Sequence, residues 1–200
     1  MKTSRVEAFS DGVMAILITI MVLELKVPRG ETVQALVPLI PIFLSYVLSF
    51  TYLGIYWNNH HHLLQTCDRV TGSILWANLH LLFWLSLIPF TTGWLGENHF
   101  AAVPSALYGL VLLMAALAYW MLQALIIIAS QGPDSLLKRA IGGDWKGKGS
   151  LLLYLLAMAV AFKSPGIAQG GYVVVALLWL IPDRRIERAL SHQAIEPRLE

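Results

Sequence analysis

The sequence is poor in charged residues and in cysteine. Only 13% of its 200 residues are Asp, Glu, Lys or Arg, against about 25% in ordinary globular domains. Hydrophobic residues make up 57%, and the mean hydropathy is +0.65. This composition argues against a soluble globular domain and indicates an integral membrane protein of one domain. The single cysteine, Cys67, excludes an intrachain disulfide.

Several functional motifs are also missing. The sequence has no nucleophile elbow, no glycine-rich phosphate loop and no His-Glu-x-x-His motif, so we expect no enzyme activity, metal or cofactor. It lacks the Thr-Val-Gly-Tyr-Gly filter of ordinary potassium channels. Its basic residues flank hydrophobic segments, which membrane topology explains, so nucleic-acid binding is not expected.

The hydrophobic segments predict an all-α membrane protein with six transmembrane helices. A helix needs roughly 20 residues, at 1.5 Å each, to cross a bilayer. The fifth segment is the weakest prediction because it is only about 20 Å long as a helix. We expect residues 1–183 to form the transmembrane domain and residues 184–200 a charged tail. The predicted spans are Val6–Leu25, Val33–Leu64, Val70–Leu95, Ala101–Ala129, Ser150–Phe162 and Ile167–Ile181.

The basic residues predict the orientation. If both termini face the cytoplasm, the outer segments hold only Lys26, Arg29 and Lys163, and every other Lys and Arg lies on the inner side. The positive-inside rule favours this arrangement. Five spans would place the basic C-terminal end outside. We therefore predict a multi-pass protein of the cell membrane with cytoplasmic N- and C-termini.

The first segment carries ionisable residues where membrane helices rarely have them. Arg5, Glu7 and Asp11 lie near its start, and Glu24 lies at its end. An ionisable group at the centre of a membrane helix costs about 2.5–3.5 kcal/mol on insertion scales and indicates a functional site. Asp11 lies only about two turns from the start of the segment, so its cost is lower, but its carboxylate still needs a partner.

One face of the same segment forms an aliphatic stripe with a single hydroxyl. At 100° per residue, this stripe comprises Gly12, Ile16, Thr19, Ile20 and Leu23, and the Asp11 side chain points away from it. The two faces therefore have different neighbours, of which one could be a symmetry axis. From the residues alone, a lipid-facing or core-facing surface is the commoner explanation.

Polar residues of two later segments approach the membrane from the same side as Asp11. Three consecutive histidines, residues 60–62, end the second segment, and Asn78 and His80 lie early in the third. Buried polar groups need partners, so packing alone favours a hydrogen-bonded network among the first three helices. A zinc site of His60, His80 and Asp11, or a pH-responsive histidine cluster, stays open.

The start of the first segment reads Arg5-x-x-x-Phe9-Ser10-Asp11-Gly12, followed by Ala15-Ile16-x-x-Thr19-x-x-x-Leu23. This pattern resembles the signature of the transmembrane protein 175 family of potassium channels. The resemblance extends more loosely to residues 57–62 and 76–90, whereas the last two segments match only as hydrophobic helices.

The resemblance implies a cation channel whose first helix lines a central pore. Rings of aliphatic side chains form its constriction, and such constrictions can gate by dewetting. It also implies a structural polar network that ties the pore helix to its neighbours. The pore-lining residues would be Ile16, Thr19, Ile20 and Leu23, the pore-mouth residues Gly12 and Glu24, and the network residues Arg5, Phe9, Ser10, Asp11, His62, Asn78 and His80.

One signature helix per chain predicts a homotetramer, because a central pore needs several such helices around its axis. The permeant ion would be potassium, moderately preferred over sodium. Potassium ions, other copies of the chain and membrane lipid are the expected partners.

Two other functions remain open. A proton-coupled transporter could use Asp11 and His80 as a relay, although such transporters usually show repeats and broken helices that this sequence lacks. A membrane enzyme or metal-handling protein could instead centre on the histidine cluster.

Overall fold

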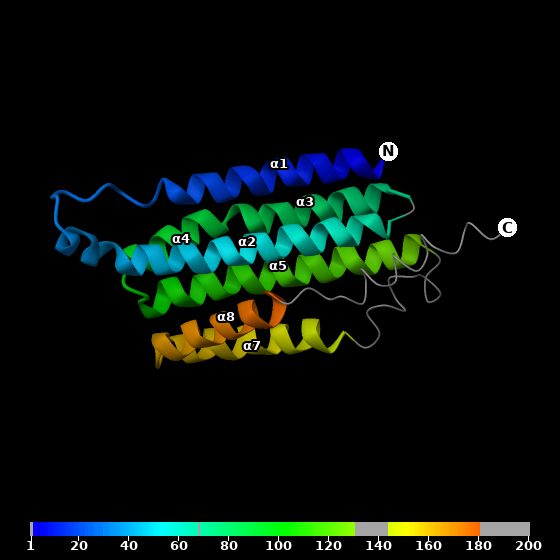
Figure 1. Ribbon diagram of the computed structural model, residues 1–200. Coiled ribbons are helices and arrows are strands. Elements are labelled where there is room, and N and C mark those ends of the chain that lie inside the picture. The colour runs from blue at the N-terminus through cyan, green and yellow to red at the C-terminus, as the bar shows by residue number, and fades with distance from the viewer. Residues whose placement is uncertain (1, 68, 131–143, 181–200) are drawn as a thin grey trace, which may run out of the picture.

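A computed structural model describes residues 2–67, 69–130 and 144–180. Every regular element within these ranges is a helix, and the helices form an elongated bundle (Figure 1). The elements are α1 (Thr3–Val22), the 3₁₀ helix η1 (Val33–Leu39), α2 (Ile40–Gln65), α3 (Gly72–Ser86), α4 (Ile88–Glu97), α5 (Ala102–Ala129), α7 (Trp145–Ala161) and α8 (Pro165–Leu180).

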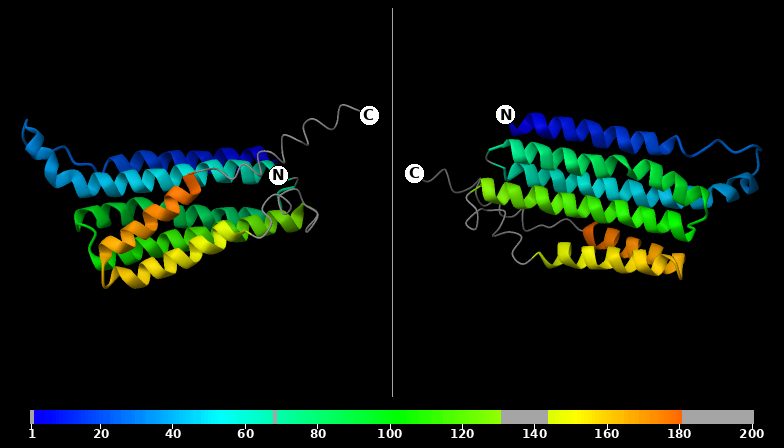
Figure 2. Two further views of the ribbon diagram at one scale, coloured as in Figure 1. Left: turned by 60° about the horizontal axis from the view of Figure 1, so that its bottom comes forward. Right: turned by 180° about the vertical axis from the view of Figure 1, so that it is seen from behind.

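Helix α1 lies at one side of the bundle, and the pair α7 and α8 lies at the opposite side (Figures 1 and 2). Between them, α1 packs on α2, α3 and α4, and α5 packs on α3, α4 and α7. The core between these layers is apolar and holds three fully buried tyrosines, Tyr52, Tyr108 and Tyr172. Because α1 lies at the edge of the bundle, much of its surface has no neighbour in the chain.

Three helical stretches are long and apolar enough to cross a membrane: Val33–Gln65, Gly72–Glu97 and Ala102–Ala129. The first two contain internal breaks. Pro38 and Pro41 lie where η1 gives way to α2, and Pro89 lies in the first turn of α4. Proline lacks the N–H of a helical hydrogen bond and crowds the preceding turn, which explains both breaks.

Helices α7 and α8 have 17 and 16 residues, about 26 and 24 Å at the helical rise. Helix α7 begins at Trp145, earlier than the predicted Ser150, so the fifth segment is longer than the sequence suggested. The reason is Asp144, whose side chain accepts a hydrogen bond from the Gly147 backbone N–H at 3.2 Å and caps the helix. The predicted tail lies outside the described residues.

Helices α2 and α4 approach each other so closely at Gly96 that no side chain fits there. A Cβ atom on Gly96 would lie 2.6 Å from both Ile42 Cα and Ser45 Oγ. The Ser45 hydroxyl also donates to the carbonyls of Ile42 (2.9 Å) and Thr92 (3.2 Å), so it cannot move freely. This contact fixes α2 and α4 relative to each other, and α1 packs on both of these helices.

We expect Gly96→Ala to lower the thermal unfolding temperature, since overpacking of this kind costs about 1–3 kcal/mol. Gly170→Ala is the matched control, because a Cβ on this α8 residue would meet nothing within 4 Å. The control should unfold at or above the wild-type temperature. Equal losses in the two variants would contradict the close approach of α2 and α4.

Candidate functional site

Helix α1 is packed along one face and exposed along the other. Its exposed row contains Ile16 (57% exposed), Ile20 (43%) and Leu23 (74%). Gly12 and Thr19 are exposed on the same row. The opposite, buried row comprises Val6, Ser10, Met14, Leu17 and Met21.

Thr19 is a polar residue on a mainly aliphatic row. Its hydroxyl donates to the carbonyl oxygen of Ile16 at 2.9 Å. The donor is therefore satisfied within the helix, and the hydroxyl oxygen keeps acceptor capacity on the exposed face. Chemically, the row offers the apolar side chains of Ile16 and Ile20 with a hydroxyl oxygen between them.

Asn78 of α3 joins α1 to α2 through its side-chain amide. Its Nδ2 donates to Ser10 Oγ at 2.9 Å, and its Oδ1 pairs with His60 Nε2 at 2.7 Å. The Ser10 hydroxyl in turn donates to the Val6 carbonyl at 2.9 Å. All three side chains are buried. Because an amide oxygen only accepts, the proton in the second bond belongs to His60 Nε2.

Helices α1 and α2 also bond to each other directly, through a pair of residues that was not predicted from the sequence. His61 Nδ1 pairs with Glu7 Oε1 at 2.5 Å, and Gln65 Nε2 lies 2.8 Å from the other nitrogen of the His61 ring. The interhelical bonds therefore use the first two of the three consecutive histidines. The resemblance implied His62 instead, and because consecutive residues project about 100° apart on a helix, His62 faces a different direction from His60 and His61.

Other residues of the predicted network lie outside it. Phe9 is 55% exposed, and the exposed side chain of Arg5 makes no hydrogen bond to a described residue. His80 Nε2 accepts from the Trp84 indole of its own helix at 2.9 Å. His62 stacks edge-on against His61.

Several buried polar atoms on these helices have no hydrogen-bond partner among the described residues. They are Asp11 Oδ1, His60 Nδ1, His62 Nδ1 and His80 Nδ1. No described group of three His, Cys, Asp or Glu side chains could hold a metal ion. Within the described ranges, the alternative zinc set of Asp11, His60 and His80 is thus not assembled.

Acidic groups gather at the other end of α1. The carboxylate of Glu24 lies against α4, with Oε2 only 3.2 Å from where a Gly93 Cβ would stand. Nearby, Lys26 Nζ forms an exposed ion pair with Glu97 Oε1 at 2.8 Å. The hydrogen bond to Glu97 raises the pKa of Lys26. These contacts fasten the segment that follows α1 to the end of α4.

The sequence is similar to those of known ion channels. Residues 5–89, which contain α1 and the Asn78 network, match the family described as endosomal/lysosomal potassium channel TMEM175. A potassium channel of Chryseobacterium sp. is 57% identical over 191 residues, which is 96% of this chain and 99% of that protein. The chain belongs to the TMEM175 family.

The fold of this TMEM175 chain also has a solved counterpart. The crystal structure of a lysosomal potassium-selective channel TMEM175 homolog from Chamaesiphon minutus superimposes with a TM-score of 0.78 at 30% identity, covering 90% of this chain and 97% of that one. The human endosomal/lysosomal proton channel TMEM175 matches over 97 residues at 35% identity, which is 42% of this chain but only 19% of the human protein.

Asn78→Ala is expected to destabilise the TMEM175 chain by about 1–3 kcal/mol, because it leaves Ser10 and His60 without their shared partner in a buried site. Thermal unfolding in detergent measures the loss. Ser86→Ala is the matched control at the exposed end of the same helix, where the hydroxyl only donates to its own helix at Phe83. If Asn78→Ala were as stable as Ser86→Ala, the hydrogen bonds of Asn78 would not contribute to the stability of the fold.

Proposed function

We propose that the protein is a potassium-permeable channel of the cell membrane in which α1 from each of four chains lines a central pore. The observation that carries the proposal is the exposed row of α1 opposite a fully packed face, in a chain of the TMEM175 family. The row is regular over the length of the helix, as a surface repeated around an axis would require. Relatives named as potassium channels support the choice of ion.

Each chain supplies one α1, so four chains would place four copies of each row residue around the axis. In the proposed pore, Ile16, Ile20 and Leu23 form successive aliphatic rings. Such rings give ions no oxygen in place of hydration water, so conduction requires them to widen, and closure works by dewetting. The Thr19 ring would supply oxygens between them.

The ends of α1 would form the mouths of this pore. Gly12, midway along α1, would widen the pore on one side of the Ile16 ring because it has no side chain, and Glu24, just beyond the end of α1, would place negative charge near one mouth. A negative mouth raises the local concentration of cations. Selectivity from pore width and a threonine ring, without a carbonyl filter, is expected to favour potassium over sodium only moderately.

The proposal includes six spans with both termini cytoplasmic. Helices α7 and α8 are shorter than the roughly 30 Å hydrocarbon core, so tilt or local thinning of the bilayer would accommodate them. The hydrogen bonds of Asn78 to Ser10 and His60 support a structural role for these three residues. Asp11 Oδ1 and His80 Nδ1 have no partner among the described residues, so the proton relay is tested below by the flux experiment.

Purified protein in proteoliposomes is expected to take up potassium down its gradient, without substrate and without a proton gradient. Native mass measurement of the same preparation should give a tetramer. Because the human relative is named a proton channel, proton flux is recorded in parallel. Uptake that strictly requires a proton gradient would support a coupled transporter, and an active monomer would overturn the shared pore.

Ile16→Asn is expected to increase the leak and raise sodium permeability relative to potassium, because four amides would wet the constriction and remove its size filter. Paired potassium and sodium fluxes measure the effect. Ile167→Asn on α8 is the control, since Ile167 is 67% exposed on the side of the bundle opposite α1 (Figure 1). Unchanged selectivity in an assembled Ile16→Asn tetramer would exclude this residue from the pore.

A further inference from the structure

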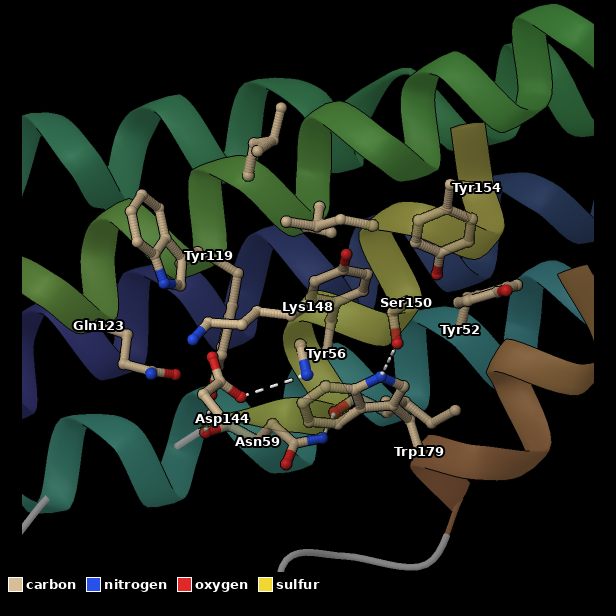
Figure 3. A pocket seen from close by; sticks show the side chains of 16 residues that line it. Tyr52, Tyr56, Asn59, Tyr119, Gln123, Asp144, Lys148, Ser150, Tyr154 and Trp179 are labelled. Atoms are coloured by element: carbon tan, nitrogen blue, oxygen red, sulfur yellow. Dashed lines mark hydrogen bonds between the residues drawn. The ribbon is translucent and has the colours of Figure 1, made fainter. Parts of the chain in front are cut away.

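A cavity of about 180 Å³ is lined by residues of α2, α5, α7 and α8 (Figure 3). Aromatic side chains form a large part of its wall. The aromatic lining residues are Tyr52, Tyr56, Tyr119, Trp120, Tyr154 and Trp179.

The cavity has two chemically different ends. Figure 3 shows the aromatic side chains of Tyr52 and Tyr154 at one end, and Gln123, Asn59 and Asp144 at the other. An apolar space with a few polar groups at one end is the usual form of a ligand site. Its shape suits an amphiphile rather than a wholly polar or wholly apolar molecule.

The walls of the cavity are held in place by the protein itself. The Trp179 indole donates to Ser150 Oγ at 2.8 Å, and that hydroxyl donates to the Lys146 carbonyl at 2.8 Å. The Tyr119 hydroxyl donates to the Asn59 carbonyl at 3.2 Å. The site is therefore preformed, which lowers the entropy cost of binding.

The polar end carries two ammonium groups, Lys146 and Lys148, and one carboxylate, Asp144, so its formal charge is positive in sum. Asp144 is engaged as the N-cap of α7 through the Gly147 N–H, and Lys146 Nζ lies 5.9 Å from the centre of the Trp179 ring. Lys148 lines the cavity one turn further along, and its ammonium forms no hydrogen bond or ion pair within the described ranges. A ligand head at Lys148 would thus be an anion.

Size and location define the rest of the ligand. A 150 Å³ apolar cavity is known to hold a benzene molecule, so 180 Å³ suits one ring or a short alkyl segment. The cavity lies among membrane-spanning helices, and its wall residue Trp120 is 52% exposed on the outer surface of the bundle. An alkyl chain from the surrounding lipid is the apolar group present there.

We propose that this cavity binds the alkyl chain of an anionic amphiphile, with its carboxylate or phosphate at Lys148. A free fatty acid and an anionic phospholipid share this chemistry. The site is separate from the proposed pore, and its occupancy is measured without ion flux, so its failure would leave the channel proposal intact.

The full-length protein in detergent is titrated with ω-bromooctanoate and with the uncharged ω-bromooctanol, and tryptophan fluorescence is followed because bromine quenches indoles in contact with it. Octanoate should give a saturable component and bind about tenfold more tightly than the alcohol, as expected for one charge-assisted hydrogen bond. Equal binding of the two probes would overturn the proposal.

Two variants with matched controls locate the binding. Lys148→Gln should weaken octanoate binding about tenfold and leave octanol binding unchanged, whereas Lys163→Gln, beyond the other end of α7, should change neither. Ala116→Phe fills the cavity and should abolish the saturable component for both probes. Leu152→Phe adds the same ring to the exposed side of α7 and should abolish nothing. Loss in both phenylalanine variants alike would overturn the assignment to the cavity.

Vesicles of phospholipids with brominated acyl chains distinguish a bound phospholipid from a bound free fatty acid. Quenching that is lost in Ala116→Phe and occurs with phosphatidylglycerol but not with phosphatidylcholine would support an anionic phospholipid. Such quenching with bromooctanoate alone would support a free fatty acid. If neither brominated phosphatidylglycerol nor bromooctanoate gave quenching that Ala116→Phe abolishes, the proposed site would be wrong.

Discussion

The side-chain amide of Asn78 fixes the rotation of α1, and the candidate pore face depends on that rotation. In a membrane, each polar group without a partner is costly. Both polar groups of the amide have a partner, because its N–H donates to Ser10 and its oxygen accepts from His60. Turning α1 by one residue, about 100°, would break the bond to Ser10 and turn Ile16 away from the exposed row. A buried network of three residues thus orients a face that it does not itself touch.

Much of this site could be predicted from the sequence, because it follows from helical periodicity. The spacing of Ile16, Thr19, Ile20 and Leu23 placed them on one face, and the structure leaves that face exposed. The histidine was not predicted correctly: the resemblance implied His62, whereas the interhelical hydrogen bonds use His60 and His61. Which of residues 60–62 meets α1 or α3 depends on the rotation and crossing of α2, and these are set by tertiary packing at contacts such as Gly96 against Ile42.

In the fold, too, some features could be predicted from the sequence and others could not. Composition and hydrophobic runs predicted the helical stretches, and Pro89 explains the break between α3 and α4. The early start of α7 depends on the Asp144 cap, a local hydrogen bond that hydropathy does not reveal. The cavity could not be predicted at all, because Tyr52, Tyr119, Tyr154 and Trp179 come from four helices distant in the sequence. Sequence patterns describe single helices, whereas cavities arise where helices meet.

Exposure alone does not distinguish a lipid-facing helix surface from a pore-facing one, since hydrocarbon accepts aliphatic side chains as readily as a dry constriction does. The chemistry of the exposed faces does distinguish them. On α5 and α8 every exposed residue is apolar, as contact with lipid requires. The exposed face of α1 instead includes Arg5 in its first turn and Thr19 further along, and Asp11 lies on a different face, where its Oδ1 is buried. Ionisable residues in a membrane helix avoid lipid and mark interior faces or ion pathways. This polar content is what favours α1, rather than α5 or α8, as the helix that faces the axis in the proposed pore.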